Sequence, residues 1–567
     1  MTPRRDNNIA WTLTLRAETD PDLPAVIMPA SRHKDISRRH YLTTTFAELE
    51  SASNRMAHAL LAAGISPGTR AVLMVRPSLE FFSLTFAVFK SGIIPIFIDP
   101  GMGIRGLGQC IADSRATAFI GIPQAHLARR LFGWGRGAIN QFVVIKSDDF
   151  IKSKTRQNPW QNISLENQPG TPPFTHVTDD QTAAILFTSG STGPAKGVVY
   201  THRVFNAQVQ ALRSLLHITP GEVDLCTFPL FALFAPALGM TSVIPRMDFT
   251  RPGRVNPREV IGPALRFGVT NLFGSPALLR RVQEYGRQQQ VTLPKLNRVV
   301  SAGAPVPADV IAGVKSMLRA DAQVFTPYGA TESLPVACIG SDEILGETAA
   351  LSAQGRGVCV GRPVAGMSVQ IIAVTDAAIE KISQAPILPT GEVGEIVVSA
   401  QQVTQAYDAR PEANAKAKIA DDSNATPRLM HRMGDLGYID TQGRLWFCGR
   451  KAHRVHTALG PLDTIPTEAI FNQHPAVFRT ALVGICEKAD STSEKPLQKP
   501  VICVELRPGR HNWPKICQDL QAMAAADASL SQITVFLRHK SFPVDIRHNS
   551  KIFREKLATW AAGRVPQ

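Results

Sequence analysis

The sequence contains few cysteines and no long apolar run. Its eight cysteines are scattered over 567 residues without a CxxC pair, which predicts reduced thiols and favours a cytoplasmic protein. No stretch approaches the roughly 20 apolar residues that a membrane-spanning helix needs. Polar residues follow Arg4 and Arg5, which disfavours a secretory signal. We therefore expect no transmembrane segment.

The sequence also lacks the usual features of a nucleic-acid-binding protein. Lysine and arginine outnumber aspartate and glutamate by 61 to 46, which gives a formal net charge of +15. This surplus is spread along the chain, without an arginine-rich tail or zinc-finger spacing. We predict no nucleic-acid partner, because an anionic substrate and general solubility account for the positive charge.

The apolar pattern of the first half predicts an α/β fold. Helical spacing over 46–63 and 80–90 alternates with buried-strand patterns at 71–75 and 93–98. This alternation is typical of βαβ units, which build a parallel sheet.

The length and the later pattern predict a division into two domains. Short strands with glycine turns between 369 and 448 indicate a β-rich subdomain, whereas the polar stretch 147–180 is expected to be a connector. The predicted fold class is α/β, with parallel-sheet α/β subdomains and this β-rich subdomain in a large N-terminal domain. The predicted boundaries are 1–449 for the large domain and 450–567 for a small C-terminal α+β domain.

A glycine-rich loop directly after a predicted strand carries the strongest chemical signal. Residues 188–197 read TSGSTGPAKG, with three glycines, four hydroxyl side chains and one lysine. Glycines let the backbone approach phosphate oxygens, hydroxyl and N–H groups donate hydrogen bonds, and Lys196 supplies positive charge. The pattern is not a Walker A loop, because Ala195 precedes the lysine where that motif has glycine. A flexible surface linker is the alternative for the loop taken alone.

Four further motifs follow the loop: YGATE at 328–332, MGDLGY at 433–438, GRK at 449–451 and HNSKIFREKL around Lys551. In this order, and over nearly the whole length, the motifs resemble the acyl-adenylating superfamily of acyl-CoA synthetases, nonribosomal-peptide adenylation domains and firefly luciferase. The resemblance implies an enzyme that uses ATP, with Mg²⁺ as cofactor, to join a carboxylic acid to AMP. It also implies that the small C-terminal domain is mobile.

The resemblance implies roles for individual residues. Lys196, Glu332 and Lys551 would be catalytic, and Lys551 would contact both the carboxylate and the α-phosphate. Thr188 and Glu332 match the positions that hold Mg²⁺, and Asp435 would accept hydrogen bonds from the ribose hydroxyls. The implied nucleotide-binding residues are Thr188, Ser189, Gly190, Ser191, Thr192, Gly193, Gly303, Ala304, Tyr328, Gly329, Ala330, Thr331, Asp435 and Arg450.

Several of these residues have ordinary structural alternatives. SAGAP at 301–305 and Tyr328 resemble an adenine-binding wall, yet they would also suit a strand followed by a turn. Glu332 would suit the start of a helix, and Lys551 a surface position in a basic tail. The order of the motifs along the chain favours the nucleotide site.

An apolar stretch after the loop predicts the acid-binding pocket. Residues 227–240 read TFPLFALFAPALGM, and the expected pocket residues are Phe228, Phe231, Phe234 and Leu238. A long apolar substrate suits this wall, because each buried methylene contributes about 0.8 kcal/mol. Ordinary core packing is the alternative.

Two stretches, 224–257 and 267–278, and the HNSKIFREKLA segment resemble one branch of the superfamily, the β-lactone synthetases of bacterial long-chain olefin biosynthesis. This branch implies adenylation of a long-chain 2-alkyl-3-hydroxy acid, whose own hydroxyl then closes a β-lactone and expels AMP. The hinge and thiol-tunnel positions hold Ala452 and His456, which depart from the thioester-forming pattern.

Two alternatives to lactone formation stay open. One is a long-chain fatty acyl-CoA ligase or acyl-AMP ligase; the other is a non-catalytic nucleotide-binding protein, which the intact motif residues disfavour. The implied substrate is a long-chain β-hydroxy acid. A reactive lactone product makes a multienzyme assembly with other olefin-pathway enzymes a reasonable expectation.

Overall fold

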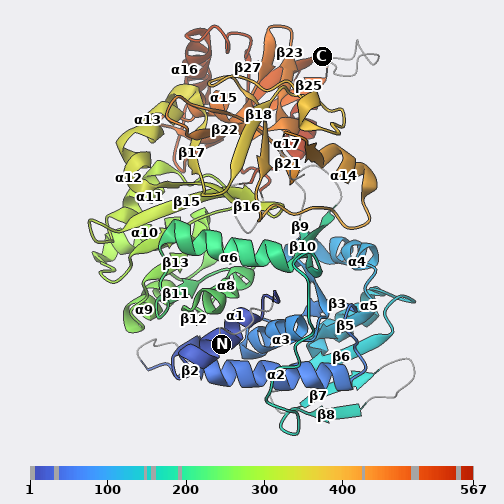
Figure 1. Cartoon of the computed structure of the whole chain (residues 1–567). Helices are drawn as coiled ribbons and strands as arrows, with labels where there is room; N and C mark the ends of the chain where they lie inside the picture. Colours follow the sequence, from blue (N-terminus) through green and yellow to red (C-terminus); the bar gives the residue numbers. More distant parts are fainter. Residues whose placement is uncertain are drawn as a thin grey trace.

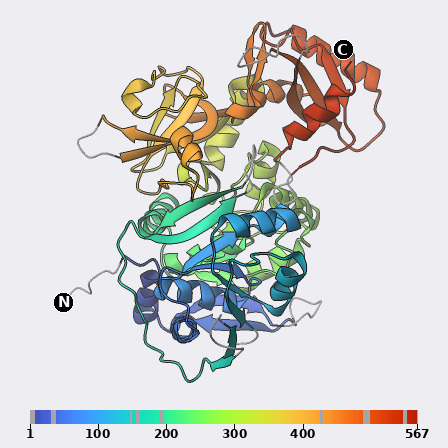
Figure 2. The same ribbon diagram turned by 90° about the vertical axis from the view of Figure 1, so that its right-hand side faces the viewer.

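The computed structural model describes residues 7–30, 38–145, 150–154, 161–188, 195–423, 428–486, 497–544 and 551–565. The N-terminal half of the chain forms the lower body of the molecule (Figure 1). Figure 2 shows two smaller lobes above this body, one of yellow and orange strands and one of red C-terminal elements.

Eight strands form the first sheet: β3 (Arg70–Met74), β4 (Ile94–Ile98), β5 (Ala118–Gly121), β6 (Gln141–Ile145), β7 (Phe150–Lys154), β8 (Gln161–Ser164), β9 (Thr182–Thr188) and β10 (Lys196–Thr201). Their order is β10-β9-β4-β3-β5-β6-β7-β8. The strands from β9 to β6 are parallel neighbours, whereas β10 at one edge and β7 and β8 at the other are antiparallel.

Helices cover both faces of this sheet: α2 (Phe46–Ala62), α3 (Leu79–Lys90), α4 (Gly103–Asp113) and α5 (Pro123–Phe132). Alternate residues of β3 point to opposite faces, so Ala71 and Leu73 join the core with α2 and α3, and Val72 joins the core with α4 and α5. Helix α2 begins at a capping box, in which Thr45 and Glu48 satisfy each other's backbone N–H groups.

The second sheet contains fourteen described strands. They are β1 (Pro24–Pro29), β2 (Tyr41–Thr45), β11 (Val223–Cys226), β12 (Thr241–Val243), β13 (Asn271–Phe273), β14 (Arg298–Val300), β15 (Gln323–Ala330), β16 (Ser333–Gly340), β17 (Val358–Pro363), β18 (Ser368–Ile372), β19 (Gly394–Ser399), β20 (Lys418–Asp421), β21 (Arg428–Ile439) and β22 (Leu445–Arg450). Their path is β18-β19-β21-β22-β17-β16-β15-β14-β13-β11-β12-β1-β2, with β20 beside β21. The steps from β15 to β1 are parallel, and those from β18 to β15 are antiparallel.

The predicted α/β class with a β-rich subdomain is therefore confirmed. The helices that accompany the parallel half are α6 (His202–Leu216), α7 (Pro229–Ala232), α8 (Phe234–Leu238), α9 (Arg258–Arg266), α10 (Pro276–Gln289) and α11 (Ala308–Lys315). None of the helices within the described ranges is long and apolar enough to cross a membrane.

The C-terminal elements are β23 (Val455–Thr457), β24 (Gly460–Leu462), α15 (Thr464–Phe471), β25 (Val477–Cys486), β26 (Gln498–Leu506), α16 (Trp513–Ala525), β27 (Val535–Arg538) and α17 (Arg554–Ala562). Strands β25, β26 and β27 form a sheet of their own. Two apolar cores consist only of residues from 455 to 565. The boundary at residue 450 stays a prediction.

The prediction of a connector over 147–180 was wrong in part. Strands β7 and β8 lie within it and extend the edge of the first sheet through antiparallel pairing. Both strands are short and rich in polar residues. Edge strands bury only part of their side chains, so they lack the apolar run that marks a central strand.

A buried ion pair joins α2 to α3. The ammonium group of Lys90, which has no exposed side-chain surface, donates to the Glu50 carboxylate at 2.6 Å, to the Asn54 carbonyl at 2.6 Å and to the Ser53 hydroxyl at 2.7 Å. Thr14 donates to the second oxygen of Glu50 at 2.9 Å. Burial lowers the pKa of Lys90 to about 8, while the charge of Glu50 raises it. These contacts leave both buried charges compensated.

Replacing Lys90 with methionine should destabilise the protein by about 3–5 kcal/mol, because the Glu50 carboxylate would stay buried without its cation. The free energy of unfolding in urea measures this loss. A matched control is Arg319→Met, which breaks the exposed pair of Arg319 with Asp321 and should cost no more than about 1 kcal/mol. Equal losses in the two variants would contradict the expectation.

Candidate active site

Asp435 joins three strands of the second sheet. It lies on β21 as the register partner of Arg450 on β22. Its Oδ2 accepts a 2.6 Å hydrogen bond from the Tyr328 hydroxyl on β15, and its Oδ1 lies 3.1 Å from the Arg450 guanidinium. Arg450 also donates to the Met433 carbonyl at 3.1 Å. The structure thus brings together three residues expected to bind the nucleotide.

The carboxylate of Asp435 can accept a further hydrogen bond from a ligand. Its Oδ1 has the charge contact with Arg450, but no hydrogen-bond donor from the described residues reaches it. Buried polar atoms are nearly always hydrogen-bonded, so this oxygen fits a donor such as a ribose hydroxyl. Burial raises the pKa of Asp435, whereas the charges of Arg450 and Lys551 and the Tyr328 hydroxyl lower it. Lys551 therefore lies within electrostatic reach of Asp435.

Glu332 and Lys196 meet at Tyr407. One oxygen of the Glu332 carboxylate accepts a 2.7 Å hydrogen bond from the Tyr407 hydroxyl. The Lys196 ammonium, at the start of β10, lies 4.8 Å from the centroid of the Tyr407 ring. The backbone carbonyl of Glu332 accepts from the N–H and the hydroxyl of Thr404, at 2.9 and 3.0 Å. Two residues expected to be catalytic therefore share a neighbour that the motifs did not indicate.

A half-buried cation near Glu332 was also missed. Lys418 on β20 donates to the Thr404 carbonyl, and its ammonium lies 5.9 Å from the Tyr407 ring centroid. Burial lowers the pKa of Lys418 to about 7, although the charge of Glu332 raises it. Its register partner is His431 on β21, and burial lowers the pKa of this imidazole. Lys418 was not singled out from the sequence, and its position near Glu332 reveals it, whereas the sequence left the role of His431 undecided.

The centre of the glycine loop lies outside the described residues. This applies to Ser189, Gly190, Ser191, Thr192 and Gly193, and of Thr188 only the backbone is described. Strands β9 and β10 lead into and out of the loop, and Lys196 pairs with Thr188 across them. The backbone N–H of Asp408 donates to the Gly197 carbonyl at 2.7 Å. The base of the loop therefore lies beside the segment that carries Tyr407.

The other expected nucleotide residues lie where two parallel neighbours, β14 and β15, end. Gly303 and Ala304 follow β14, and Gly303 has a φ of +92°, which favours glycine.

Gly329 is close-packed at the end of β15, where an added Cβ would lie 2.5 Å from the Ser333 carbonyl oxygen. Ala330 pairs with the same Ser333. The Thr331 carbonyl accepts a 2.5 Å hydrogen bond from the Tyr200 hydroxyl. Ligands of α/β sheets bind beyond such carboxyl ends.

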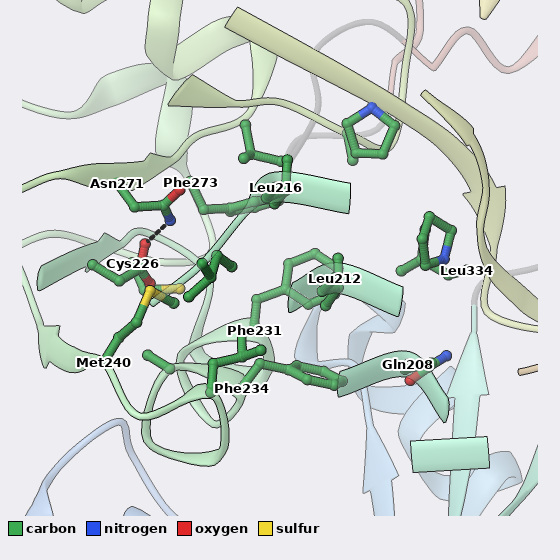
Figure 3. A pocket seen from close by; sticks show the side chains of 18 residues that line it. Gln208, Leu212, Leu216, Cys226, Phe231, Phe234, Met240, Asn271, Phe273 and Leu334 are labelled. Carbon is green, nitrogen blue, oxygen red and sulfur yellow. Dashed lines mark hydrogen bonds between the residues drawn. The ribbon is translucent and has the colours of Figure 1, made fainter. Parts of the chain in front are cut away.

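An apolar cavity of about 80 Å³ lies beside this edge (Figure 3). Three of the residues expected in the acid-binding pocket line it: Phe231 from α7, and Phe234 and Leu238 from α8. Phe228 is not among its lining residues, and its ring packs 5.2 Å from that of Phe231. Helix α6 and strands β11 and β13 supply further walls that sequence reasoning missed: Gln208, Leu212, Leu216, Asp224, Cys226, Asn271 and Phe273. These residues are far apart in the chain, so no local pattern marks them.

Ala452, one of the two positions that depart from the thioester-forming pattern, lies just before the C-terminal elements. Ala452 lies in a short 3₁₀ turn, Lys451–His453, after β22. Further on, Glu468 of α15 accepts from Arg554 of α17 at 2.9 Å and from the Leu482 N–H at 2.8 Å. Arg554 follows Lys551 by three residues, which ties the chain next to Lys551 to the C-terminal core.

Replacing Asp435 with asparagine should weaken ATP binding by roughly 10- to 100-fold, because a hydrogen bond to a charged group contributes about 1.5–3 kcal/mol. Equilibrium titration with a non-hydrolysable ATP analogue measures the effect. Asp321→Asn, at an exposed position, is the matched control and should bind normally. An unchanged affinity in the Asp435 variant would remove Asp435 from the nucleotide site.

Comparison with known proteins identifies the family. Residues 13–408 match the family described as AMP-binding enzyme. The chain is 48% identical to an olefin β-lactone synthetase of Xanthomonas campestris pv. campestris, over 98% of this chain and 97% of the relative. It is 47% identical to the olefin β-lactone synthetase of Stenotrophomonas maltophilia, over 99% of each chain.

Solved structures agree on the fold. The amide bond synthetase McbA from Marinactinospora thermotolerans has a TM-score of 0.76 at 20% identity, covering 98% of this chain and 99% of its own. The o-succinylbenzoate CoA synthetase from Bacillus subtilis in complex with AMP has a TM-score of 0.73 at 20% identity, covering 98% of both chains. The chain belongs to the AMP-binding enzymes and, within them, to the family of the olefin β-lactone synthetases.

Proposed function

We propose that this protein uses ATP to adenylate a long-chain 2-alkyl-3-hydroxy acid and then cyclises the adenylate to a β-lactone. The products are the lactone, AMP and pyrophosphate. The observation that carries the proposal is identity of 47–48% over nearly the full length of two olefin β-lactone synthetases. Membership of an adenylate-forming family implies that ATP is used.

In the first step a carboxylate oxygen of the acid attacks the α-phosphorus, and the bond from that phosphorus to pyrophosphate breaks. Two anions must be held in line, so the site has to supply positive charge. We assign this role to Lys551 at the carboxylate and to Lys196 at the base of the glycine loop. Asp435 and Arg450 would hold the ribose, and the edge with Gly303 and Ala304 would receive the adenine.

Mg²⁺ fits the oxygen chemistry of this site. Proteins commonly hold Mg²⁺ through one or two carboxylates together with phosphate oxygens of the substrate. Glu332 offers a carboxylate of which one oxygen is held by Tyr407, and we propose that it holds the ion together with Thr188. When bound, the ion would neutralise charge on the phosphates. In the described ranges no three His, Cys, Asp or Glu side chains gather into a ligand cluster, which agrees with a site completed by substrate.

In the second step the 3-hydroxyl oxygen attacks the activated carbonyl carbon. The hydroxyl proton is released, the bond from that carbon to the phosphate oxygen breaks, and AMP leaves with the bonding electrons. Well-oriented intramolecular groups can reach effective molarities of roughly 10⁵ M or more, so no external thiol is needed. The altered hinge positions Ala452 and His456 support this route.

The proposal includes the organisation of the pathway. The C-terminal domain from residue 450 would rotate between the two steps and carry Lys551 with it. A lactone with two alkyl branches is reactive and poorly soluble, so hand-over to another pathway enzyme in an assembly would protect it. The cysteines are free thiols, in keeping with a cytoplasmic location for this chemistry.

Purified protein with Mg²⁺, ATP and a 2-alkyl-3-hydroxy fatty acid should form AMP, pyrophosphate and a β-lactone without CoA. Mass spectrometry of the organic extract detects the lactone, and a parallel reaction with CoA tests thioester formation. The matched control is the same acid without its 3-hydroxyl group, which should be adenylated but not cyclised. Formation of acyl-CoA alone, and only with CoA present, would favour the ligase alternative.

Replacing Lys551 with alanine should lower the rate of adenylate formation by at least about 100-fold while ATP binding changes little. The reason is that a positioned charge acts mainly in the transition state. Pyrophosphate release measures the rate, and titration with an ATP analogue measures binding. Lys556→Ala, on the following helix, is the control. Adenylation at the wild-type rate would exclude Lys551 from the reaction.

A further inference from the structure

Two buried polar side chains line one end of the apolar cavity. Asp224 on β11 and Asn271 on β13 are register partners, and the Asn271 amide donates a hydrogen bond to the Asp224 carboxylate (Figure 3). Both side chains line the cavity, and neither residue is more than 5% exposed. Arg298 on β14 is the register partner of Asn271 on its other side, and it pairs with Glu222 at 2.5 Å. A row of polar residues therefore crosses three neighbouring strands.

This row lies at the end of the cavity away from the nucleotide residues. Along β14 and the residues after it, Val300 and Ala302 follow Arg298 at two-residue steps, and both line the cavity. Ala302 directly precedes Gly303 of the expected adenine wall. Four residues of extended chain span at most about 14 Å, so this is the greatest depth from Ala302 to the polar row. The cavity is therefore a short pocket with an apolar wall and a polar floor.

Extension of an alkyl chain beyond the polar floor is energetically unfavourable. The side-chain carbonyl oxygen of Asn271 is buried without a hydrogen-bond partner among the described residues. Burial raises the pKa of Asp224 to about 7, although Asn271 and Arg298 lower it. A methyl group offers no hydrogen bond to either side chain. A longer chain would have to separate Asp224 from Asn271 and leave two buried polar groups unpaired.

The cavity is also small. Its volume of about 80 Å³ is roughly half of the 150 Å³ with which an apolar protein cavity has been found to hold one benzene molecule. Two alkyl branches of one substrate therefore do not fit side by side in this cavity. At most one branch could enter it, and the other would lie outside it.

We propose that Asp224 and Asn271 form a floor that sets the length of one alkyl branch of the substrate. The inference rests on the proposed function for the identity of the acid. The other branch does not reach this floor, so the two branches should differ in how sharply their length is selected. This makes Asp224 and Asn271 specificity-determining residues, outside the motifs that carry the adenylation chemistry.

The test compares two series of 2-alkyl-3-hydroxy acids, one varying the 2-alkyl branch and one varying the chain beyond C3. The readout is kcat/KM for pyrophosphate release. In the double variant Asp224→Ala and Asn271→Ala, longer acids of one series should gain activity, by about fourfold for each methylene newly buried. The other series should keep the wild-type profile. The matched control is Asp224→Asn, which keeps the side-chain size and an oxygen that accepts from the Asn271 amide; it should keep the wild-type length limit in both series.

A second variant tests the same floor if the double alanine protein does not fold. Asn271→Gln moves the amide one methylene into the cavity and should shorten the preferred branch in the same series only. Unchanged profiles in the folded double alanine variant and in Asn271→Gln, or equal shifts in both series, would overturn the floor. Pyrophosphate release precedes cyclisation, so a wild-type protein that adenylates these acids without forming lactone refutes the proposed function and leaves this test valid.

Discussion

The buried negative charge of Asp435 constrains the arrangement of the whole second sheet. A carboxylate that is only 3% exposed is tolerated when cations and donors surround it. Arg450 comes from the neighbouring strand, but Tyr328 lies on β15, which is four strand positions from β21 in the sheet. Four spacings of about 4.8 Å would separate these strands by roughly 19 Å in a flat sheet. A 2.6 Å hydrogen bond between them therefore requires the sheet to bend, so that its parallel and antiparallel halves close around Asp435.

Tyr407 brings together charged side chains from several parts of the chain. It holds the Glu332 carboxylate, and the ammonium groups of Lys196 and Lys418 lie near its ring. The residues come from β10, β20, the β15–β16 turn and a segment without regular structure. An aromatic ring attracts cations to its face while its hydroxyl serves a carboxylate, so one side chain can place charges of opposite sign near each other.

The sequence predicted those parts of the molecule that leave a local or ordered signal. The alternation around 71–98 indicated β3, α3 and β4 within about one residue, and the motif order indicated the family. Tyr407 and Lys418 left no such signal, because they matter only through contacts with Glu332. Asp224 and Asn271 were missed for the same reason, since a single hydrogen bond between parallel strands creates no periodicity. The strands β7 and β8 were missed because polar edge strands resemble loops.

The pair of Glu468 and Arg554 has a mechanical consequence for Lys551. Arg554 anchors the start of α17 to α15 inside the C-terminal core. Lys551 lies three residues before Arg554, so its backbone is attached closely to the C-terminal core. In the proposed rotation of the C-terminal domain, the distance from Lys551 to Asp435 would therefore depend mainly on the angle of this domain. A modest change of that angle would engage or withdraw the ammonium group without breaking a single contact inside the core.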